Sequence, residues 1–280
     1  MDTRLVIVLV LYQKKLAESP SYDILQTAVS ENETVDLFIY DNSEQAQKDS
    51  LFDLKNVHYI HDAENSGLAK AYNAGAEWLK KCKGRLLMLL DQDTVVALAD
   101  IEQILALPET EIETVGVFVP FIRSGNQQIS PVFSDTYISR ERSFPQTGVT
   151  DQALMAINSG TVLTEKGLMA VEAFNESFPL DFLDHWVFWT LHQKGLKIEV
   201  LPLTFEHDLS VLDYSSVSLK RYESIISAES LFYREYDQKK LDIHTKHLLK
   251  RTLKQFLLVK NRAIWRRTWK EYRKLVRDSK

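Results

Sequence analysis

Short apolar runs alternate with amphipathic segments along most of the chain. The runs have strand length and are rich in valine, leucine and isoleucine; they are Arg4–Leu11, Val35–Tyr40, Val57–Ile60, Arg85–Leu90 and Val115–Val119. Such runs are typical of strands that are buried on both faces. Helical periodicity separates them, most clearly after Gly67, where apolar residues recur at three- and four-residue steps. The alternation predicts an α/β fold with a mainly parallel, doubly wound sheet.

The pattern changes after the fifth run. From Phe121 to about Thr150 the chain is polar, carries glycines and prolines and keeps no sustained period, which predicts a long loop or an insertion. Further elements are predicted over Ala153–Ile157, Ser159–Leu163, a helix opening near Thr164, a helix over Asp181–Lys194, a strand Lys197–Leu201, and helices Ser216–Tyr236 and His244–Arg277. We therefore expect an α/β domain over residues 1–236 and a helical tail over residues 237–280.

Composition places the chain among ordinary soluble globular proteins, because 45% of its 280 residues are hydrophobic and 26% are charged. Disordered and fibrous classes are thereby excluded. The single cysteine, Cys82, allows neither an intrachain disulfide nor a cysteine-rich zinc site, and it fits a reducing cytoplasm. The run Leu5–Leu11 is too short to span a membrane and lacks a small-residue cleavage site, so we expect no signal peptide.

Charge is distributed unevenly along the chain. Residues 246–280 hold 13 lysines and arginines against two acids, whereas the rest of the chain holds 21 bases against 37 acids. The acidic body would repel a duplex and no recognition module is visible, so the balance argues against a nucleic-acid-binding protein.

Apolar residues in the tail keep near-helical spacing among the cations; they are Leu249, Leu253, Phe256, Leu258, Trp265, Trp269, Tyr272 and Val276. A basic amphipathic helix with tryptophans is typical of a membrane-surface anchor, because the rings suit the interface and the cations meet anionic lipid. The alternative is a helix that packs its apolar face on the α/β domain or on a dimer partner.

Two carboxylates, Asp91 and Asp93, follow a predicted buried strand in the segment Leu89–Thr94. The carboxyl ends of parallel strands line the ligand crevice of an open α/β sheet. Hard cations such as Mg²⁺ are typically held by one or two protein carboxylates together with phosphate oxygens. The pair therefore suits a metal–diphosphate site, and the alternative is a solvated turn in which one acid caps the next helix.

Two further segments leave predicted strands toward the same crevice. Asp41 ends a strand before Asn42-Ser43, where a carboxylate can accept the ring N–H of uracil or thymine, unless it only forms an Asx turn. The segment Glu64–Gly75 places small residues at a helix start, which lets backbone approach a phosphate. It matches neither the dinucleotide fingerprint nor the P-loop.

A fourth segment carries Asp181 and Asp184, which are three residues apart and so are expected to share one face of a helix. A carboxylate aimed at a pocket can remove a proton from a hydroxyl nucleophile. His207 follows the next predicted strand and could ligate a metal. The alternatives are acids stabilised at a helix N-terminus and a hydrogen-bonded structural histidine.

Taken in this order, the segments resemble the family 2 glycosyltransferases, which are inverting enzymes with the GT-A fold, and most closely their bacterial rhamnosyltransferase-like branch. The resemblance covers roughly residues 4–236. It rests on the conjunction of Asp41-Asn42-Ser43, Asn65–Gly75, Leu90–Thr94, Ser159-Gly160, Phe178–Asp184 and His207.

On the donor side, the resemblance implies that Tyr12 and Asp41 meet the nucleotide base, that Asn73 lies near the diphosphate, and that Asp91 meets the ribose or the metal shell. It implies Mg²⁺ or Mn²⁺ bound by Asp93, with His207 completing the metal site.

On the acceptor side, the resemblance implies that Asp184 deprotonates the acceptor hydroxyl that attacks the anomeric carbon. The candidates for acceptor contact or for support are Ser159, Gly160, Asp181 and Trp186. Trp186 stands where related enzymes usually carry another acid, which indicates an altered pocket.

The resemblance also implies the partners: a nucleotide-sugar donor and a glycan or lipid-linked glycan acceptor, in cell-surface polysaccharide synthesis at the inner face of the cell membrane. We expect dTDP-L-rhamnose first and UDP-hexoses next, since an acid at the base does not separate thymine from uracil. A non-catalytic nucleotide-sugar-binding protein is one alternative. A sugar nucleotidyltransferase is another, but Leu11-Tyr12-Gln13-Lys14 lacks its glycine-rich loop.

Overall fold

The computed structural model describes residues 4–138, 142–207 and 218–278, and these residues form two compact units. The first unit comprises the described residues up to 133 and from 142 to 207. The second comprises residues 134–138 and those from 218 onward. Helix α7 (Leu219–Glu235) belongs to the second unit because it packs on the C-terminal helices. The helical part therefore starts before residue 237, where the sequence placed the boundary.

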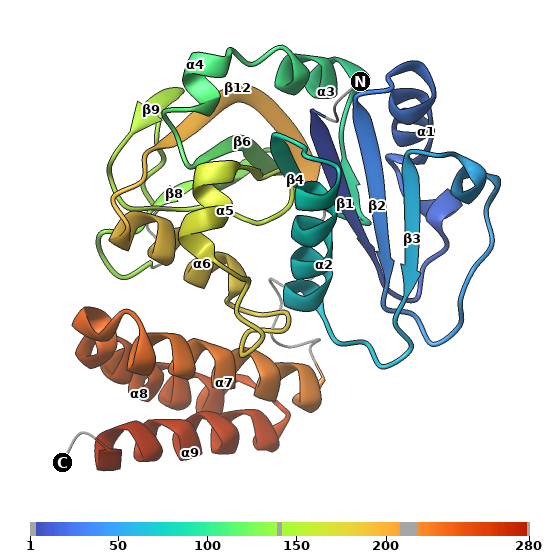
Figure 1. Ribbon diagram of the computed structural model, residues 1–280. Coiled ribbons are helices and arrows are strands. Elements are labelled where there is room, and N and C mark those ends of the chain that lie inside the picture. Colours follow the sequence, from blue (N-terminus) through green and yellow to red (C-terminus); the bar gives the residue numbers. More distant parts are fainter. Residues whose placement is uncertain (1–3, 139–141, 208–217, 279–280) are drawn as a thin grey trace. The chain divides into compact units, whose positions relative to one another are not determined.

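Parallel strands form the centre of the first unit, as the apolar runs predict. They are β1 (Leu5–Leu11), β2 (Val35–Asp41), β3 (Val57–His61) and β4 (Leu86–Asp91), in the spatial order β3-β2-β1-β4 (Figure 1). The sheet continues through β11 (Val162–Thr164), β6 (Val117–Ser124), β12 (Ile198–His207) and β5 (Thr94–Val95). Strands β11 and β5 run antiparallel to their neighbours, so the mainly parallel α/β fold is confirmed.

Helices cover both faces of this sheet (Figure 1). Helix α1 (Tyr22–Glu31) leads from β1 to β2, whereas α2 (Leu68–Lys81) leads from β3 back across the sheet to β4. Crossovers between parallel strands are right-handed as a rule, so the opposite directions of these two place the helices on opposite faces. A Cβ at Gly75 of α2 would lie 2.3 Å from a methyl carbon of Val8, so glycine is what allows this close packing. The other helices are α3 (Leu98–Leu105), α4 (Glu109–Ile112), α5 (Glu165–Val171) and α6 (Leu183–Gln193).

Part of the predicted loop over residues 121–150 is wrong, because it contains short strands. Strand β6 extends to Ser124, and the additional strands are β7 (Gln127–Ser130), β8 (Val132–Phe133) and β9 (Gly148–Thr150). β7 pairs with β6 and β9 with β12, and β8 pairs with β10 (Leu154–Met155). Short, partly exposed strands need no continuous apolar run, so hydropathy misses them.

The second unit contains α7, α8 (Leu241–Leu258) and α9 (Arg262–Asp278). The prediction of a single helix over His244–Arg277 is wrong. The helix is interrupted at residues 259–261, and α9 packs against α8. These helices bury a core that consists of Tyr222, Ile226, Leu248, Ile264 and Leu275. No helix in the described ranges is both long and apolar enough to cross a bilayer.

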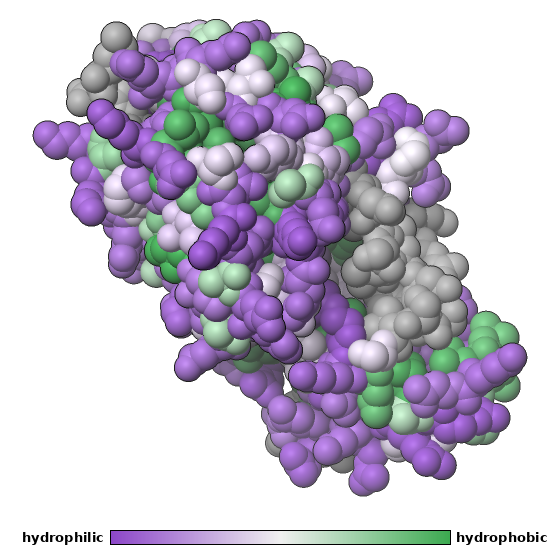
Figure 2. Space-filling model, turned by 90° about the vertical axis from the view of Figure 1, so that its right-hand side faces the viewer, coloured by the Kyte–Doolittle hydropathy of each residue, from purple (hydrophilic) through white to green (hydrophobic). Residues whose placement is uncertain are grey.

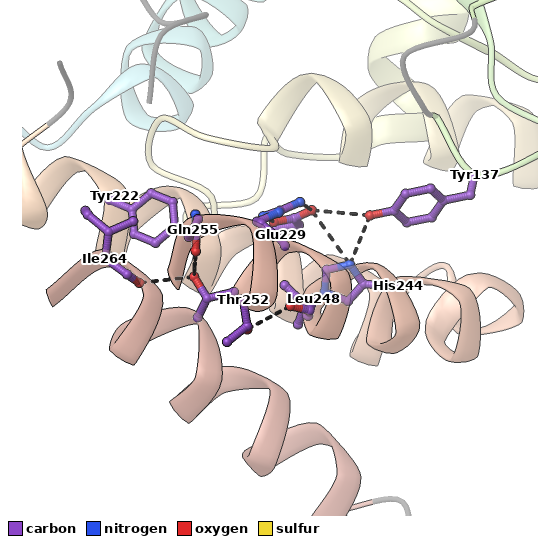
Figure 3. A network of polar contacts seen from close by, with 10 residues as sticks. Tyr137, Tyr222, Glu229, His244, Leu248, Thr252, Gln255 and Ile264 are labelled. Atoms are coloured by element: carbon purple, nitrogen blue, oxygen red, sulfur yellow. Dashed lines mark hydrogen bonds and ion pairs between the residues drawn. The ribbon is translucent and has the colours of Figure 1, made fainter. Parts of the chain in front are cut away.

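A polar network lies inside the second unit (Figure 3). Glu229 accepts two hydrogen bonds from Arg251, at 2.6 and 2.8 Å, and one from the hydroxyl of Tyr137 at 3.4 Å. The Tyr137 hydroxyl also lies 3.2 Å from Nδ1 of His244. Burial lowers the pKa of His244 to about 4. The network therefore holds a neutral histidine beside a paired carboxylate, and it joins segment 134–138 to the helices.

Candidate functional site

Three of the predicted site residues leave adjacent parallel strands at one edge of the sheet. The register pairs Leu11 with Asp41 and Val10 with Asp91, and Tyr12 follows Leu11 directly. The carboxyl ends of β1, β2 and β4 therefore gather Tyr12, Asp41 and Asp91 at the position where open α/β sheets bind ligands.

Asp41 is fully buried and hydrogen-bonded by its own surroundings. Its Oδ1 accepts from the backbone N–H of Ser43 at 3.0 Å, and its Oδ2 accepts from Gln47 Nε2 and from the Tyr59 hydroxyl, each at 2.8 Å. Burial alone would raise the pKa of this carboxyl, but the hydrogen bonds from Ser43, Gln47 and Tyr59 outweigh it and lower the pKa. Asp41 is thus an ionised anchor that fixes the loop after β2.

A pocket of about 630 Å³ opens between the loops that follow β1 and β2. Its lining includes Gln13, Lys14, Lys15, Ser43, Gln47 and Lys48. Gln47 joins the two loops, because its Oε1 accepts from the N–H of Leu16 at 2.6 Å while its Nε2 donates to Asp41. Beside the pocket, the exposed Tyr12 donates its N–H to Gln92 Oε1 at 2.8 Å, which connects this loop to the Asp91–Asp93 turn.

The Asp91–Asp93 turn is held by Ser159. The N–H of Asp91 donates to Ser159 Oγ at 2.9 Å, and Ser159 Oγ lies 2.6 Å from the hydroxyl of Thr94. Gly160 has a φ of 83°, and a Cβ there would lie 2.6 Å from the ring of Phe205. Ser159 therefore supports the turn through hydrogen bonds, and Gly160 packs against Phe205 where a side chain would not fit.

His207 is the last residue of β12, and the sheet register places it opposite Thr94. Its backbone therefore lies beside the Asp91–Asp93 turn, whereas its side chain is outside the described part of the structure. Among the described side chains, no group of three or more His, Cys, Asp and Glu residues could hold a metal ion. Mg²⁺ needs only one or two protein carboxylates when phosphate oxygens complete its shell, so Asp91 and Asp93 fit a cation that arrives with a diphosphate.

Asp184 lies in the first turn of α6 and is a quarter exposed. Its Oδ1 accepts from the N–H of His185 at 2.8 Å and lies 3.0 Å from Nδ1 of the same ring. Phe182, which stacks on His185, has a left-handed φ of 64°, so the helix starts only at Leu183. Asp181 precedes the helix, and the prediction that it shares a helical face with Asp184 is wrong.

Tyr72 brings the two acidic motifs together. This residue of α2 is fully buried, and burial raises its pKa well above the ordinary value. The charges of Asp91 and Asp184 raise the pKa of Tyr72 further, so both carboxylates lie near the same phenol. Sequence reasoning missed Tyr72, because only the fold shows which face of α2 meets both acids.

Asn73 holds the loop that precedes Asp184. Its Oδ1 accepts from the N–H of Phe174 at 2.7 Å, and its Nδ2 donates to the carbonyl of the same residue at 3.0 Å. The N–H of Leu68 donates to Pro179 O at 2.6 Å, and a Cβ at Gly67 would clash with that carbonyl. The first amide of α2 is therefore occupied by the loop rather than open to an anion. Both observations link the Asn65–Gly75 motif to the segment that carries Asp184.

Two further residues of α6, His185 and Trp186, follow Asp184 in the sequence. Trp186 is only 8% exposed, so it packs within the protein. His185 was not predicted as a site residue, although its position next to Asp184 in the sequence was the available signal.

Comparisons with known proteins agree with the resemblance seen in the sequence. Residues 32–162 match the glycosyl transferase family 2. The dTDP-rhamnosyl transferase RfbF of Shigella flexneri is 23% identical over 206 residues, which cover 72% of this chain and 68% of that protein.

Solved structures share the fold. S. aureus TarS superposes with a TM-score of 0.53 and 15% identity over 92% of this chain, which spans 44% of the TarS chain. A TarS fragment in complex with UDP-GlcNAc gives a TM-score of 0.52 and 15% identity over 93% of this chain and 74% of that chain. At this identity the likeness shows the fold alone, which is the GT-A arrangement of a mostly parallel sheet with flanking helices.

Proposed function

Because residues 32–162 match the glycosyl transferase family 2, we propose that the chain is an inverting glycosyltransferase with Asp184 as its base. The proposal is carried by the sheet register that gathers Tyr12, Asp41 and Asp91 at one edge, and it is supported by the nearness of Asp91 and Asp184 to Tyr72. Asp91 is the last residue of the central strand β4. Asp184 lies in the first turn of α6, more than ninety residues later. Their common neighbour supports a single site for donor and base.

The base step uses the exposed part of Asp184. An acceptor hydroxyl would hydrogen-bond to its carboxylate, give up its proton to it, and attack the anomeric carbon from the face opposite the leaving nucleotide. The configuration at that carbon is thereby inverted. His185 holds one carboxylate oxygen through its backbone N–H, which orients the other oxygen for the acceptor.

Donor binding is assigned to the sheet edge. Tyr12 would cover the base, and Oδ1 of Asp41, which accepts from the N–H of Ser43, would also accept the base ring N–H. The lowered pKa of Asp41 keeps this acceptor ionised at neutral pH. Asn73 would act near the diphosphate through the loop that it holds.

Mg²⁺ or Mn²⁺ is the proposed cofactor, held by Asp93 with Asp91 beside it and His207 from β12. When bound, such a cation stabilises the negative charge of the departing diphosphate. The support is the pair of carboxylates at the end of β4 and the register that sets His207 opposite Thr94.

The donor proposal is dTDP-L-rhamnose first, supported by the similarity to RfbF, and a UDP-hexose second, supported by the shared fold with TarS. The proposed acceptor is a glycan or lipid-linked glycan used in cell-surface polysaccharide synthesis. The reaction would then take place at the cytoplasmic face of the cell membrane.

The test is a panel of nucleotide sugars that includes dTDP-rhamnose, UDP-glucose, UDP-galactose and UDP-GlcNAc. Each is scored for thermal stabilisation of the purified chain and for release of nucleoside diphosphate with a glycan acceptor. Stabilisation and release by the dTDP-sugar support the first choice. Stabilisation by a UDP-sugar alone reverses the order of donors, and binding of a donor without any turnover would instead support a non-catalytic nucleotide-sugar-binding protein.

A further inference from the structure

The end of α8 exposes large apolar side chains that the helical core does not use. The buried residues of α8 are His244, Leu248, Thr252 and Gln255, which repeat at three- and four-residue steps and so form one face. The exposed ones, here called the apolar corner, are Leu253, Phe256, Leu257 and Leu258. Leu257 and Leu258 are 76% and 70% exposed. In Figure 2, hydrophobic surface gathers at the level of the C-terminal helices, with hydrophilic side chains around it.

The stretch of sequence that carries the apolar corner is rich in exposed cations. Between Asp242 and Glu271 the sequence contains no acid. The exposed cations of this stretch are Lys246, Lys250, Lys254, Lys260, Arg262, Arg266 and Lys270. The guanidinium of Arg262 lies over the ring of Phe256, 5.2 Å from its centroid, and that of Arg266 lies 5.7 Å from the ring of Trp265. Arg262 thus holds positive charge directly against an apolar side chain of the corner.

We infer that the apolar corner and its cations form a docking surface for an anionic lipid bilayer. Leucine and phenylalanine side chains enter the boundary between headgroups and acyl chains, while lysine and arginine reach the phosphates. A second copy of this chain is a poor occupant, because two such corners would bring like charges together without an acid to pair them. The inference identifies the membrane-facing residues and depends on the proposed function only for its biological purpose.

The location of the surface differs from the one that the sequence pattern suggested. A single amphipathic helix would insert Trp265 and Trp269 along its length. In the structure Trp265 is half-buried and packs edge-on against Phe256 at 5.2 Å, whereas Leu257 and Leu258 protrude at the end of α8. Docking therefore uses a corner, and the long axis of the helices does not need to lie in the interface.

The experiment is co-sedimentation of the full chain with phosphatidylcholine vesicles that contain about one third phosphatidylglycerol, and with pure phosphatidylcholine vesicles. The vesicles carry neither donor nor glycan. We expect binding to the anionic vesicles, strong weakening at high salt, and little binding to the neutral ones. Vesicle binding without sugar transfer would support the docking surface and contradict the proposed function. Sugar transfer without vesicle binding would contradict the docking surface and leave the proposed function unaffected.

Two variants separate the apolar and the electrostatic parts of the surface. Leu253→Ser/Leu257→Ser/Leu258→Ser should weaken binding at least about tenfold. Lys250→Gln/Lys254→Gln/Lys260→Gln should weaken it on the order of a hundredfold. All six side chains are exposed, so the fold should be unchanged by circular dichroism and thermal melting.

Matched controls remove equal numbers of exposed side chains from the first unit. They are Ile60→Ser/Val149→Ser/Met169→Ser and Lys80→Gln/Lys83→Gln/Lys166→Gln, and both should bind vesicles like the unaltered chain. The inference is overturned if the unaltered chain ignores anionic vesicles or if control and corner variants weaken binding equally. A dimer in sedimentation velocity that dissociates in the leucine variant would also overturn it, because the corner would then be a subunit interface.

Discussion

The N–H of Asp91 donates to Oγ of Ser159 at 2.9 Å, although the two residues lie 68 positions apart in the sequence. Ser159 Oγ also lies 2.6 Å from the hydroxyl of Thr94, on the other side of the turn. One buried hydroxyl therefore holds both ends of the turn that carries Asp91 and Asp93. The Ser159-Gly160 motif thus fixes the position of the proposed metal-binding acids without needing to touch a substrate.

Ser159→Ala is expected to lower donor turnover by roughly tenfold to a hundredfold, because the turn loses its shared partner and small displacements of catalytic groups are costly. The backbone N–H of Asp91 would also lose its acceptor, at about 1–3 kcal/mol of stability. Steady-state kinetics and chemical denaturation measure the two effects. Ser130→Ala is the matched control, since the buried Ser130 Oγ accepts from the N–H of Ile157 at 2.9 Å rather than from a residue of this turn. Equal loss of turnover in both variants would contradict the assigned role.

Asp93→Ala is expected to abolish divalent-dependent turnover and to leave the thermal melt of the protein nearly unchanged, because a half-buried turn residue contributes little to the core. Removal of the cation with EDTA should reproduce the loss in the unaltered chain, and added Mn²⁺ or Mg²⁺ should restore it. Full activity in EDTA would exclude the proposed cofactor.

Asp184→Asn should retain donor affinity and lose transfer by several orders of magnitude, since shape is conserved and the proton acceptor is not. Asp181→Asn is the matched control: the same change three residues earlier, in the turn before α6, should have a much smaller effect. Calorimetric donor titration and transfer rates distinguish binding from chemistry. A dead Asp181→Asn enzyme beside an active Asp184→Asn enzyme would move the base to the other carboxylate.

The sequence predicts the central strands well, because residues buried on both faces leave an uninterrupted apolar run. β1 and β4 each begin one residue after the predicted start. The break between α8 and α9 was not predicted, because residues 259–261 contain neither glycine nor proline and the turn depends on packing against α7. The acids at the ends of these strands could be predicted as site residues, because the apolar runs already show where the strands end.

The contacts within the site were less predictable. Asn73 and Phe174 are 101 residues apart, and no local pattern indicates that the amide of one binds the backbone of the other. The role of Tyr72 was equally unpredictable. Its position in a helix follows from the sequence pattern, but the two carboxylates near it come from separate elements. Residue types at strand ends follow from local sequence, whereas the hydrogen bonds that orient them follow from tertiary packing.

Asn73→Ala should lower the transfer rate more than the donor affinity, because the side-chain amide of Asn73 is hydrogen-bonded to the loop that leads to Asp184. A direct diphosphate contact would give the reverse pattern, with donor affinity lost first. Asn56→Ala is the matched control, since the side-chain amide of Asn56 also binds backbone: its Nδ2 donates to the carbonyls of Val29 and Val35, each at 2.8 Å. It should cost comparable stability and leave the ratio of rate to affinity unchanged.

Acid should destabilise the second unit through His244. Burial, which is the largest effect, lowers its pKa in the folded state to about 4, whereas Glu229 raises that pKa and Arg251 and His247 lower it. The unfolded chain binds a proton near pH 6.5, its ordinary value. The stabilisation is therefore complete above that pH and is lost as the pH falls toward 4, by roughly 3 kcal/mol in total.

His244→Gln removes this titration and should flatten the dependence of the unfolding free energy on pH between about 7 and 4. Urea denaturation followed by helical circular dichroism measures it. His247→Gln is the comparison, since burial also lowers the pKa of the more exposed His247 and its removal should flatten the curve less. If His244→Gln loses stability on acidification as steeply as the unaltered chain, the acid sensitivity arises from other groups. A curve flattened by His244→Gln alone would tie it to the network of Tyr137, Glu229 and His244, the contact that joins segment 134–138 to the helices.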